Sequence, residues 1–397
     1  MDSDAGVVDE SPRDQLDKLI CRPLVDSSIQ TVIIIDALDE CKDKESKSKI
    51  LSALEDILPR IPRVKFFVTG RPEQLREGFL SKELFQETDE RRLHEVGVDQ
   101  VRRDIRAFFI RHFKDLKSTR SILGEWPTQE ELNRVCERAA GLFVYAMATI
   151  RFIQSGKNPK KKLRSLLESS GGRCEGRTEF LENVTLDKLY MDILEEAFGC
   201  DDKAEDPIVR SVLGAVVLAA SPLSPNAIAA LLKLDSEDVG PRLSSVQSVL
   251  VFERENNDYP VRPFHNSFPD FIVDPKRCTN ARFCISSSHQ HATLLDRCLE
   301  LIRTDHELTD GAAGFNIPLQ YACRSWFRHL ANVPTDMLDE VMPGLRIFLE
   351  AKFLPWLEAL NAIGPEGEVL DGLEATAKRL NVCNNRSPAL LESSLGL

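Results

Sequence analysis

Residues 31–40 read TVIIIDALDE and indicate an α/β fold for the N-terminal part of the chain. A β-branched run without alternation is typical of a strand buried on both faces of a parallel sheet. Apolar residues then recur at helical spacing from Ile50 to Leu58, and VKFFVT at 64–69 predicts a second strand. Strand, helix and strand together make one βαβ unit.

Charged residues follow both predicted strands. Asp36, Asp39 and Glu40 come after the first strand, and GRPE at 70–73 places Arg71 after the second. Ligands of open parallel sheets bind beyond the carboxyl ends of the strands. There, carboxylates could hold Mg²⁺ and orient a water molecule, and an arginine could stabilise charge on a transferred phosphoryl group.

The alternative for these charged residues is structural. Asp39 and Glu40 would then only favour the N-terminus of the following helix, and Arg71 would be a solvated turn residue. Finding both motifs, in order, on one βαβ unit favours descent from a phosphate-handling site.

VIIIDALDE resembles the Walker B motif of NACHT domains in signal-transducing (STAND, NLR-like) P-loop ATPases. FFVTGRPE resembles their sensor-1 strand, in a fungal form shared with nephrocystin-like N-terminal domains. The resemblance implies that Asp36 binds magnesium and that Asp39 and Glu40 are catalytic acids that position water. It also implies that Arg71 belongs to the nucleotide-binding set as the sensor of the γ-phosphate.

The chain departs from this family at the phosphate-binding loop. Its one Gly-Lys pair, at 156–157, lacks the preceding glycine and the following hydroxyl of the G-x-x-x-x-G-K-[ST] motif. Only 30 residues precede the first strand, so we expect an N-terminally truncated domain without this loop. Losing two charge-assisted hydrogen bonds weakens nucleotide binding by about two to four decades. We therefore expect no autonomous ATPase activity and no cofactor for this chain alone, and Mg-ATP or Mg-ADP only if a P-loop is supplied.

The fold class expected for the whole chain is α/β followed by mainly α. A partial P-loop NTPase-type parallel sheet would be followed by a helical domain, a winged helix and C-terminal helices. The expected domains are the C-terminal part of a NACHT nucleotide-binding domain at 1–97, a helical domain at 98–200, a winged helix at 203–275 and a helical domain at 276–397.

Local signals support the winged-helix and C-terminal assignments. Ser224-Pro225 predicts the start of one helix, and Ser236 is expected to cap the next. Strand-like residues at 249–252 and 259–264 predict a hairpin. Farther along, the clearest helical patterns lie at 291–302, 319–330, 338–348 and 353–360, and Trp326 and Trp356 are expected as core anchors.

FHNSFPDF at 264–271 resembles the histidine motif that closes the winged helix of these ATPases. The resemblance implies that His265 touches the β-phosphate of bound ADP and holds the closed state. Asn266 stands where many members have aspartate, so the orientation of the histidine stays open. The alternative is a histidine whose ring is satisfied by backbone carbonyls at a strand end.

The amino-acid composition of the chain limits its possible binding partners and its cellular compartment. The chain of 397 residues has 63 acidic and 51 basic side chains, a formal net charge of −12, which disfavours DNA and anionic membranes. Ten cysteines without a C-x-x-C pair argue against a disulfide framework and favour a reducing cytosol. No apolar stretch approaches the roughly 20 residues that span a bilayer, so a cytoplasmic protein is expected.

The first functional hypothesis is a fragment of a nucleotide-dependent signalling switch of the innate-immunity-like type. The alternatives are a nucleotide-free scaffold and a decayed paralogue. Protein partners, or other copies of the chain, would bind through the helical surfaces.

Overall fold

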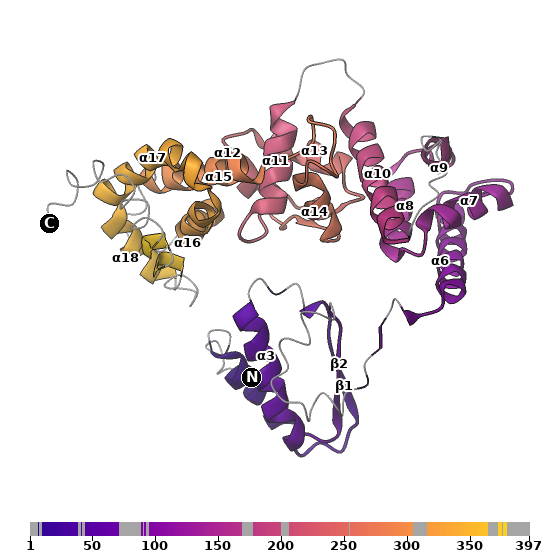
Figure 1. Ribbon diagram of the computed structural model, residues 1–397, viewed down its shortest axis with the longest axis horizontal. Helices are drawn as coiled ribbons and strands as arrows, with labels where there is room; N and C mark the ends of the chain where they lie inside the picture. Colours follow the sequence, from indigo (N-terminus) through magenta and orange to yellow (C-terminus); the bar gives the residue numbers. More distant parts are fainter. Residues whose placement is uncertain are drawn as a thin grey trace. The chain divides into compact units, whose positions relative to one another are not determined.

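The chain forms two compact units, Met1–Gly97 and Val98–Leu397 (Figure 1). The computed structural model describes residues 7, 10–38, 41, 44–70, 89, 91–92, 95–168, 178–199, 206–253, 255–304, 316–363, 372–374 and 376–378.

The first unit contains the βαβ unit that the sequence predicts. Strand β1 (Thr31–Ile35) is followed by helix α3 (Lys44–Ile57) and strand β2 (Val64–Val68). The strands are parallel, and their register pairs Thr31 with Val64 and Ile35 with Val68. The other described elements of this unit are short: α1 (Pro12–Leu16), η2 (Asp17–Cys21), α2 (Arg22–Leu24) and η4 (Leu58–Arg60).

One face of this sheet is covered and the other is open in the part of the chain that the structure describes. Ile33 and Phe66 pack against a small core that includes Leu51 and Leu54 of α3. On the opposite face, the exposed fractions are 63% for Val32, 68% for Ile34 and 58% for Phe67. The expectation of a strand buried on both faces is therefore wrong for the described residues, because α3 supplies a helical layer on one side of the sheet.

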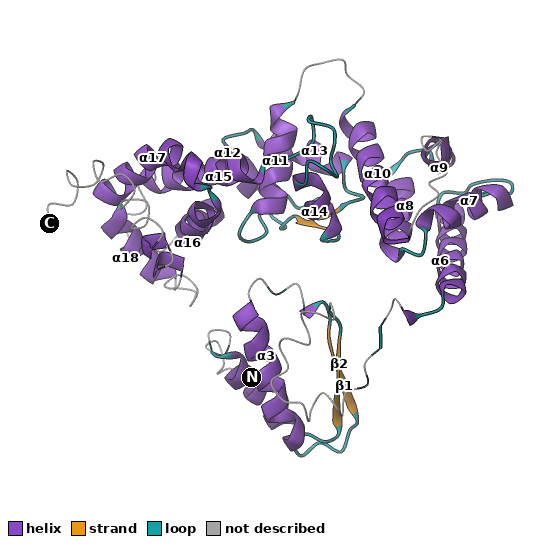
Figure 2. Cartoon of the chain, viewed as in Figure 1, coloured by secondary structure: helices purple, strands orange, loops and turns teal. Residues whose placement is uncertain are grey.

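The second unit is mainly helical (Figure 2). Its first part confirms the helices predicted between residues 98 and 200. Helix α7 begins with a capping box in which Thr128 and Glu131 satisfy each other's backbone N–H groups, and it ends at Ala140 in the left-handed region. The helices of this part are α6 (Val98–Thr119), α7 (Gln129–Ala139), α8 (Phe143–Ser155), α9 (Pro159–Glu168) and α10 (Thr178–Phe198).

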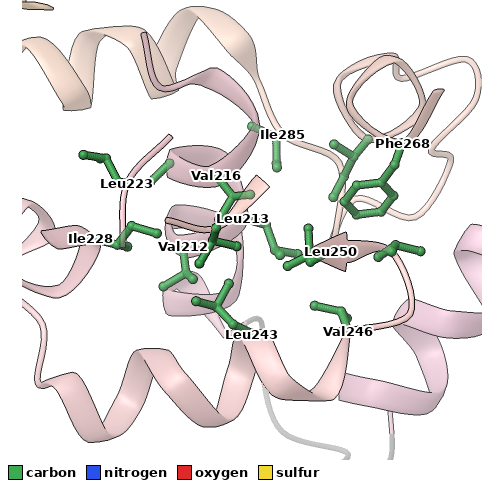
Figure 3. Close-up of a cluster of buried hydrophobic side chains, with 14 of the residues drawn as sticks. Val212, Leu213, Val216, Leu223, Ile228, Leu243, Val246, Leu250, Phe268 and Ile285 are labelled. Atoms are coloured by element: carbon green, nitrogen blue, oxygen red, sulfur yellow. The ribbon is translucent and has the colours of Figure 1, made fainter. Parts of the chain in front are cut away.

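The middle of the second unit has three helices followed by a small antiparallel hairpin. Buried aliphatic side chains from the helices and the hairpin, with Phe268, meet in one core (Figure 3). Ser224 caps its helix as predicted, because its hydroxyl accepts from the Ala227 amide at 3.2 Å. The elements are α11 (Pro207–Leu218), α12 (Pro225–Leu232), α13 (Ser236–Ser245), β3 (Leu250–Val251), β4 (Arg262–Pro263) and α14 (Ser267–Val273).

Two local predictions in this part need correction. Residue Ser236 is the first residue of α13, and its N-cap is Asp235. The strands of the hairpin have two residues each, shorter than predicted. The Val261 amide donates to the carbonyl of Leu223, outside the hairpin, at 2.8 Å. Pro263 has no N–H to donate. Neither residue can therefore extend the hydrogen bonding between the two strands.

The C-terminal part confirms the four predicted helices. They are α15 (Ser287–Thr304), α16 (Ile317–Asn332), α17 (Leu338–Ala351) and α18 (Phe353–Ile363), with the short η7 (Thr335–Met337) before α17. Trp326 and Trp356 are buried and lie with ring centroids 5.6 Å apart in an edge-on arrangement, so both anchor the core as expected.

Candidate functional site

The register of the parallel sheet brings two polar residues together at its carboxyl edge. Asp36 and Thr69 directly follow the paired residues Ile35 and Val68. The Thr69 hydroxyl donates to Oδ1 of Asp36 and accepts from the Ala37 amide at 2.8 Å. The Thr69 carbonyl accepts from the Leu38 amide at 2.9 Å.

These bonds fix the chain as it leaves β1. Ala37 has a φ of 55°, in the left-handed region, which turns the backbone sharply after Asp36. The carboxylate of Asp36 is exposed at the strand end, and one of its oxygens is oriented by Thr69. A carboxylate held in this way can coordinate Mg²⁺ directly or through water. The other predicted residues of this edge, Asp39, Glu40 and Arg71, lie outside the described residues.

Thr69 was not among the residues that the sequence singled out. The signal that points to it is its register position, because Asp36 follows β1 and Thr69 follows the strand paired with it. Sequence alone predicts both strands but not their alignment.

We expect Thr69→Val to lower the free energy of unfolding of the first unit by about 1–2 kcal/mol. Valine keeps the shape of threonine but leaves the Ala37 amide and the Asp36 carboxylate without their shared partner. Denaturant unfolding of the full chain measures the loss. Thr69→Ser keeps the hydroxyl and should cost less than Thr69→Val, whereas equal losses for the two variants would contradict this role of the hydroxyl.

His265, in the second unit, lies between β4 and α14. Its Nδ1 accepts from the Ser267 amide at 3.1 Å and is 2.7 Å from the Ser267 hydroxyl oxygen. The Tyr190 hydroxyl of α10 lies 2.7 Å from the same serine oxygen. Burial raises the pKa of Tyr190 to about 12, so its hydroxyl keeps its proton at neutral pH.

This hydrogen-bond pattern selects one tautomer of the neutral histidine. Because the Ser267 amide donates to Nδ1, that nitrogen acts as an acceptor, and Nε2 carries the ring proton. Tyr190 then donates to Ser267, and Ser267 donates to His265. Nδ1 of His265 is thus held by Ser267 rather than by a backbone carbonyl. Asn266, the N-cap of α14, makes no side-chain cap bond to this helix.

Phe264, the residue before the histidine, contacts an arginine of helix α8. Arg151 of α8 lies over the ring of Phe264, 4.4 Å from its centroid. The same guanidinium donates to the carbonyls of Gln247 at 2.7 Å and Ser248 at 3.0 Å. This arginine therefore links α8 to the hairpin that carries His265.

The Gly-Lys pair at 156–157 lies between α8 and α9 rather than between a strand and a helix. Its surroundings therefore confirm that it is not a P-loop. In the described part of the chain, no three His, Cys, Asp or Glu side chains come close enough to hold a metal ion. No described helix is both long and apolar enough to cross a membrane.

Comparison with known proteins bears on the first unit. Residues 1–71 match the family model described as Nephrocystin 3, N-terminal. The match includes β1, α3 and β2 together with Asp36 and Thr69. No curated protein matches the chain significantly. The N-terminal region of this chain, which carries the polar sheet edge, is therefore nephrocystin-like.

Proposed function

We propose that this chain carries the C-terminal part of a NACHT-type nucleotide-dependent signalling module of the fungal STAND class. The observation that carries the proposal is the oriented Asp36 carboxylate at the end of β1, within a nephrocystin-like region. In this role Asp36 binds the magnesium ion of the nucleotide. Asp39 and Glu40 position water, and Arg71 contacts the γ-phosphate.

His265 is the residue of the second unit that we propose as a nucleotide contact. Its protonated Nε2 is a hydrogen-bond donor suited to a phosphate oxygen, and the bonds from Ser267 to Nδ1 keep that proton on Nε2. We also propose that residues 203–275 form a winged helix, and the order of three helices followed by a hairpin supports this proposal. ADP bound by this residue favours a closed form, and nucleotide exchange releases an oligomerising form.

The module works with a phosphate-binding loop that another polypeptide segment supplies. The Asp36 edge alone offers neither the backbone amides nor the lysine that wrap the phosphates in P-loop proteins. This chain by itself therefore does not hydrolyse ATP. We place its action in the cytoplasm, with protein partners or other copies of the chain bound through the helical surfaces.

The experiment compares the oligomeric state of the full chain with and without millimolar Mg-ADP by analytical ultracentrifugation. We expect Mg-ADP to change the size distribution of the parent, and we expect Asp36→Asn and His265→Gln to abolish that change. Asp26→Asn and His112→Gln carry matched substitutions elsewhere and should behave as the parent does. Identical profiles for the parent and both site variants would contradict the proposal.

A second candidate function is a nucleotide-free scaffold for protein partners. The observation that favours it is the exposed apolar face of Val32, Ile34 and Phe67, since large apolar side chains gathered on a surface mark interaction sites. A scaffold predicts that partner capture is the same for Asp36→Asn and for the parent. Loss of partners in Asp36→Asn would count against it.

A further inference from the structure

Positive charge is concentrated in the first helices of the second unit, although the chain as a whole is acidic. Of the 51 basic and 63 acidic side chains, residues 98–168 hold 15 and 8, which gives this part a balance of +7 and the rest of the chain −19. A protein with such unlike regions can attract a second protein through complementary surfaces. The oppositely charged regions are therefore candidate interaction surfaces.

A basic surface is formed where the end of α6 and the start of α9 come together. The helices α6 to α9 pack as one group (Figure 1). Arg120, just past α6, donates through Nη2 to the carbonyl of Gln154 at the end of α8 at 3.1 Å. Lys160, in the first turn of α9, donates to the carbonyl of Leu123 at 3.0 Å. The basic surface comprises four exposed side chains: Arg120, Lys157, Lys160 and Lys161.

The charges at the start of α9 oppose the usual preference of a helix. Lys160, Lys161 and Lys162 lie in its first turn, which has no acidic residue, although the N-terminus of a helix favours anions. Lys162 pairs with Glu196 at 2.5 Å. Lys160 and Lys161 make no ion pair with any described residue, so no carboxylate in that part of the chain offsets their repulsion from the helix N-terminus. Residues that break a local rule in this way are expected at functional sites.

An apolar side chain lies beside these cations. Leu123, in the loop between α6 and α7, is 86% exposed, more than any other large apolar side chain in the described part of the chain. Its carbonyl holds the ammonium group of Lys160. Protein-binding sites commonly have an apolar anchor within a charged rim. The leucine therefore favours a protein as the occupant of the basic surface over a simple polyanion.

A surface of opposite charge lies in the loop between β3 and β4. Its exposed carboxylates, which we call the acidic surface, are Glu253, Glu255 and Asp258. The same loop contains Arg254, which lies outside the described residues, and Tyr259, whose side chain is 39% exposed. Oδ1 of Asp258 accepts from Nδ2 of Asn226 at 2.8 Å, which fixes this part of the loop to α12. The acidic surface, like the basic one, thus has an apolar side chain next to its charges.

We propose that the basic surface of one copy of the chain binds the acidic surface of a second copy, with Leu123 and Tyr259 in contact at the centre. A second copy is favoured because one of its loops supplies both the carboxylates and the apolar ring that complement the basic surface. The contact is head-to-tail, so dimers extend to longer assemblies as the concentration rises. This inference names the surfaces for the self-association included in the proposed function, and it requires no nucleotide.

Sedimentation velocity of the full chain without nucleotide tests the contact. We expect the average mass to rise with protein concentration and to fall between low and physiological salt, where exposed charges are screened beyond about 8 Å. Lys160→Glu combined with Lys161→Glu should weaken self-association at least about tenfold, because attraction becomes repulsion. Lys65→Glu combined with Lys188→Glu makes the same change of charge at two exposed lysines elsewhere and should associate as the parent does.

A mixing experiment distinguishes a direct contact from a general effect of charge. Glu253→Lys combined with Glu255→Lys should also weaken self-association when this variant is alone. Mixed with the Lys160→Glu, Lys161→Glu variant at equal concentration, it should restore association to at least the parental level, because each reversed surface then meets opposite charge. A mixture that stays monomeric, or a parent that is monomeric at every concentration in low salt, would overturn the proposal.

Leu123→Ala keeps the test decisive if a charge-reversed variant folds poorly, since this side chain is almost wholly exposed. We expect it to weaken self-association about tenfold by removing the apolar centre of the contact. Leu354→Ala removes the same side chain from another exposed site and should associate as the parent does. Equal association of the two leucine variants would overturn the contact. Asp36→Asn should associate as the parent does without nucleotide, so failure of the proposed nucleotide site leaves this result unchanged.

A nucleic acid is the other class of occupant that a basic surface can take. A labelled single-stranded oligonucleotide is therefore titrated into the parent and into the Lys160→Glu, Lys161→Glu variant. We expect no difference between the two at physiological salt. Binding that only the parent shows, together with a monomeric parent, would assign the basic surface to a polyanion and overturn the proposal.

Discussion

Trp356→Ala is expected to lower the free energy of unfolding of the second unit by about 4 kcal/mol, in the range found for large aromatic side chains in cores. Trp356 is fully buried, and its indole N–H donates to the carbonyl of Cys323 at 3.0 Å. Its ring lies 5.9 Å from that of Phe348 and 5.6 Å from those of Trp326 and Phe353, measured between centroids. Alanine would leave a cavity and would remove the indole hydrogen bond to α16.

Denaturant unfolding followed by circular dichroism measures this effect. Leu354→Ala changes a side chain that is 69% exposed in the same helix and should cost less than about 0.5 kcal/mol. Trp356→Phe keeps an aromatic ring but loses the indole N–H, so its cost should lie between the two. If Trp356→Ala and Leu354→Ala unfold at the same denaturant concentration, the aromatic core described here does not stabilise the unit.

Acid is expected to destabilise the second unit through His329. This histidine is buried on α16 among His291 of α15 and Tyr321 and Arg328 of its own helix. Burial first, and then the charges of His291 and Arg328, lower its pKa from 6.5 to about 3. Burial also lowers the pKa of His291.

The sign of the effect follows from proton binding. Below pH 6.5 the unfolded chain protonates at this position, while the folded chain stays neutral down to about pH 3. The unfolded state then binds more protons, so the free energy of unfolding falls as the pH falls through this window. The loss approaches about 1.4 kcal/mol per pH unit and reaches about 3 kcal/mol near pH 4.5. Above pH 6.5 the contribution of His329 to the free energy of unfolding does not depend on pH.

Denaturant unfolding between pH 7 and pH 4 measures this loss. His329→Gln keeps a polar side chain but has no titrating ring, so its free energy of unfolding should fall less steeply with pH than that of the parent. The exposed His289→Gln variant should keep the parental slope. Equal slopes for the parent and His329→Gln would show that His329 does not couple folding to pH.

Local pattern was enough to predict the secondary structure of most of the described chain. The apolar run of β1 and the helical spacing of α3 and of α15 to α18 depend on neighbours in sequence, and a strand or helix expresses such periodicity directly. The Ser224-Pro225 signal also acts within one helical turn. The hairpin strands were predicted too long because a contact to distant Leu223 ends them.

Tertiary structure alone decided the surroundings of the candidate residues. Thr69 reaches Asp36 across 33 residues of sequence, through the register of two strands. Tyr190 reaches across 77 residues of sequence to the Ser267 hydroxyl, which lies against the ring of His265. A local sequence pattern cannot predict these contacts, because they depend on how whole helices and strands pack against one another.

The sequence by itself determined that a βαβ unit with acidic residues after its first strand precedes a long helical region. It could not determine which face of the sheet is covered or which hydroxyl orients Asp36. The physical reason is the range of the interactions. Hydrophobic period and capping act over a few residues, whereas burial and strand register arise only when distant segments exclude water from one another.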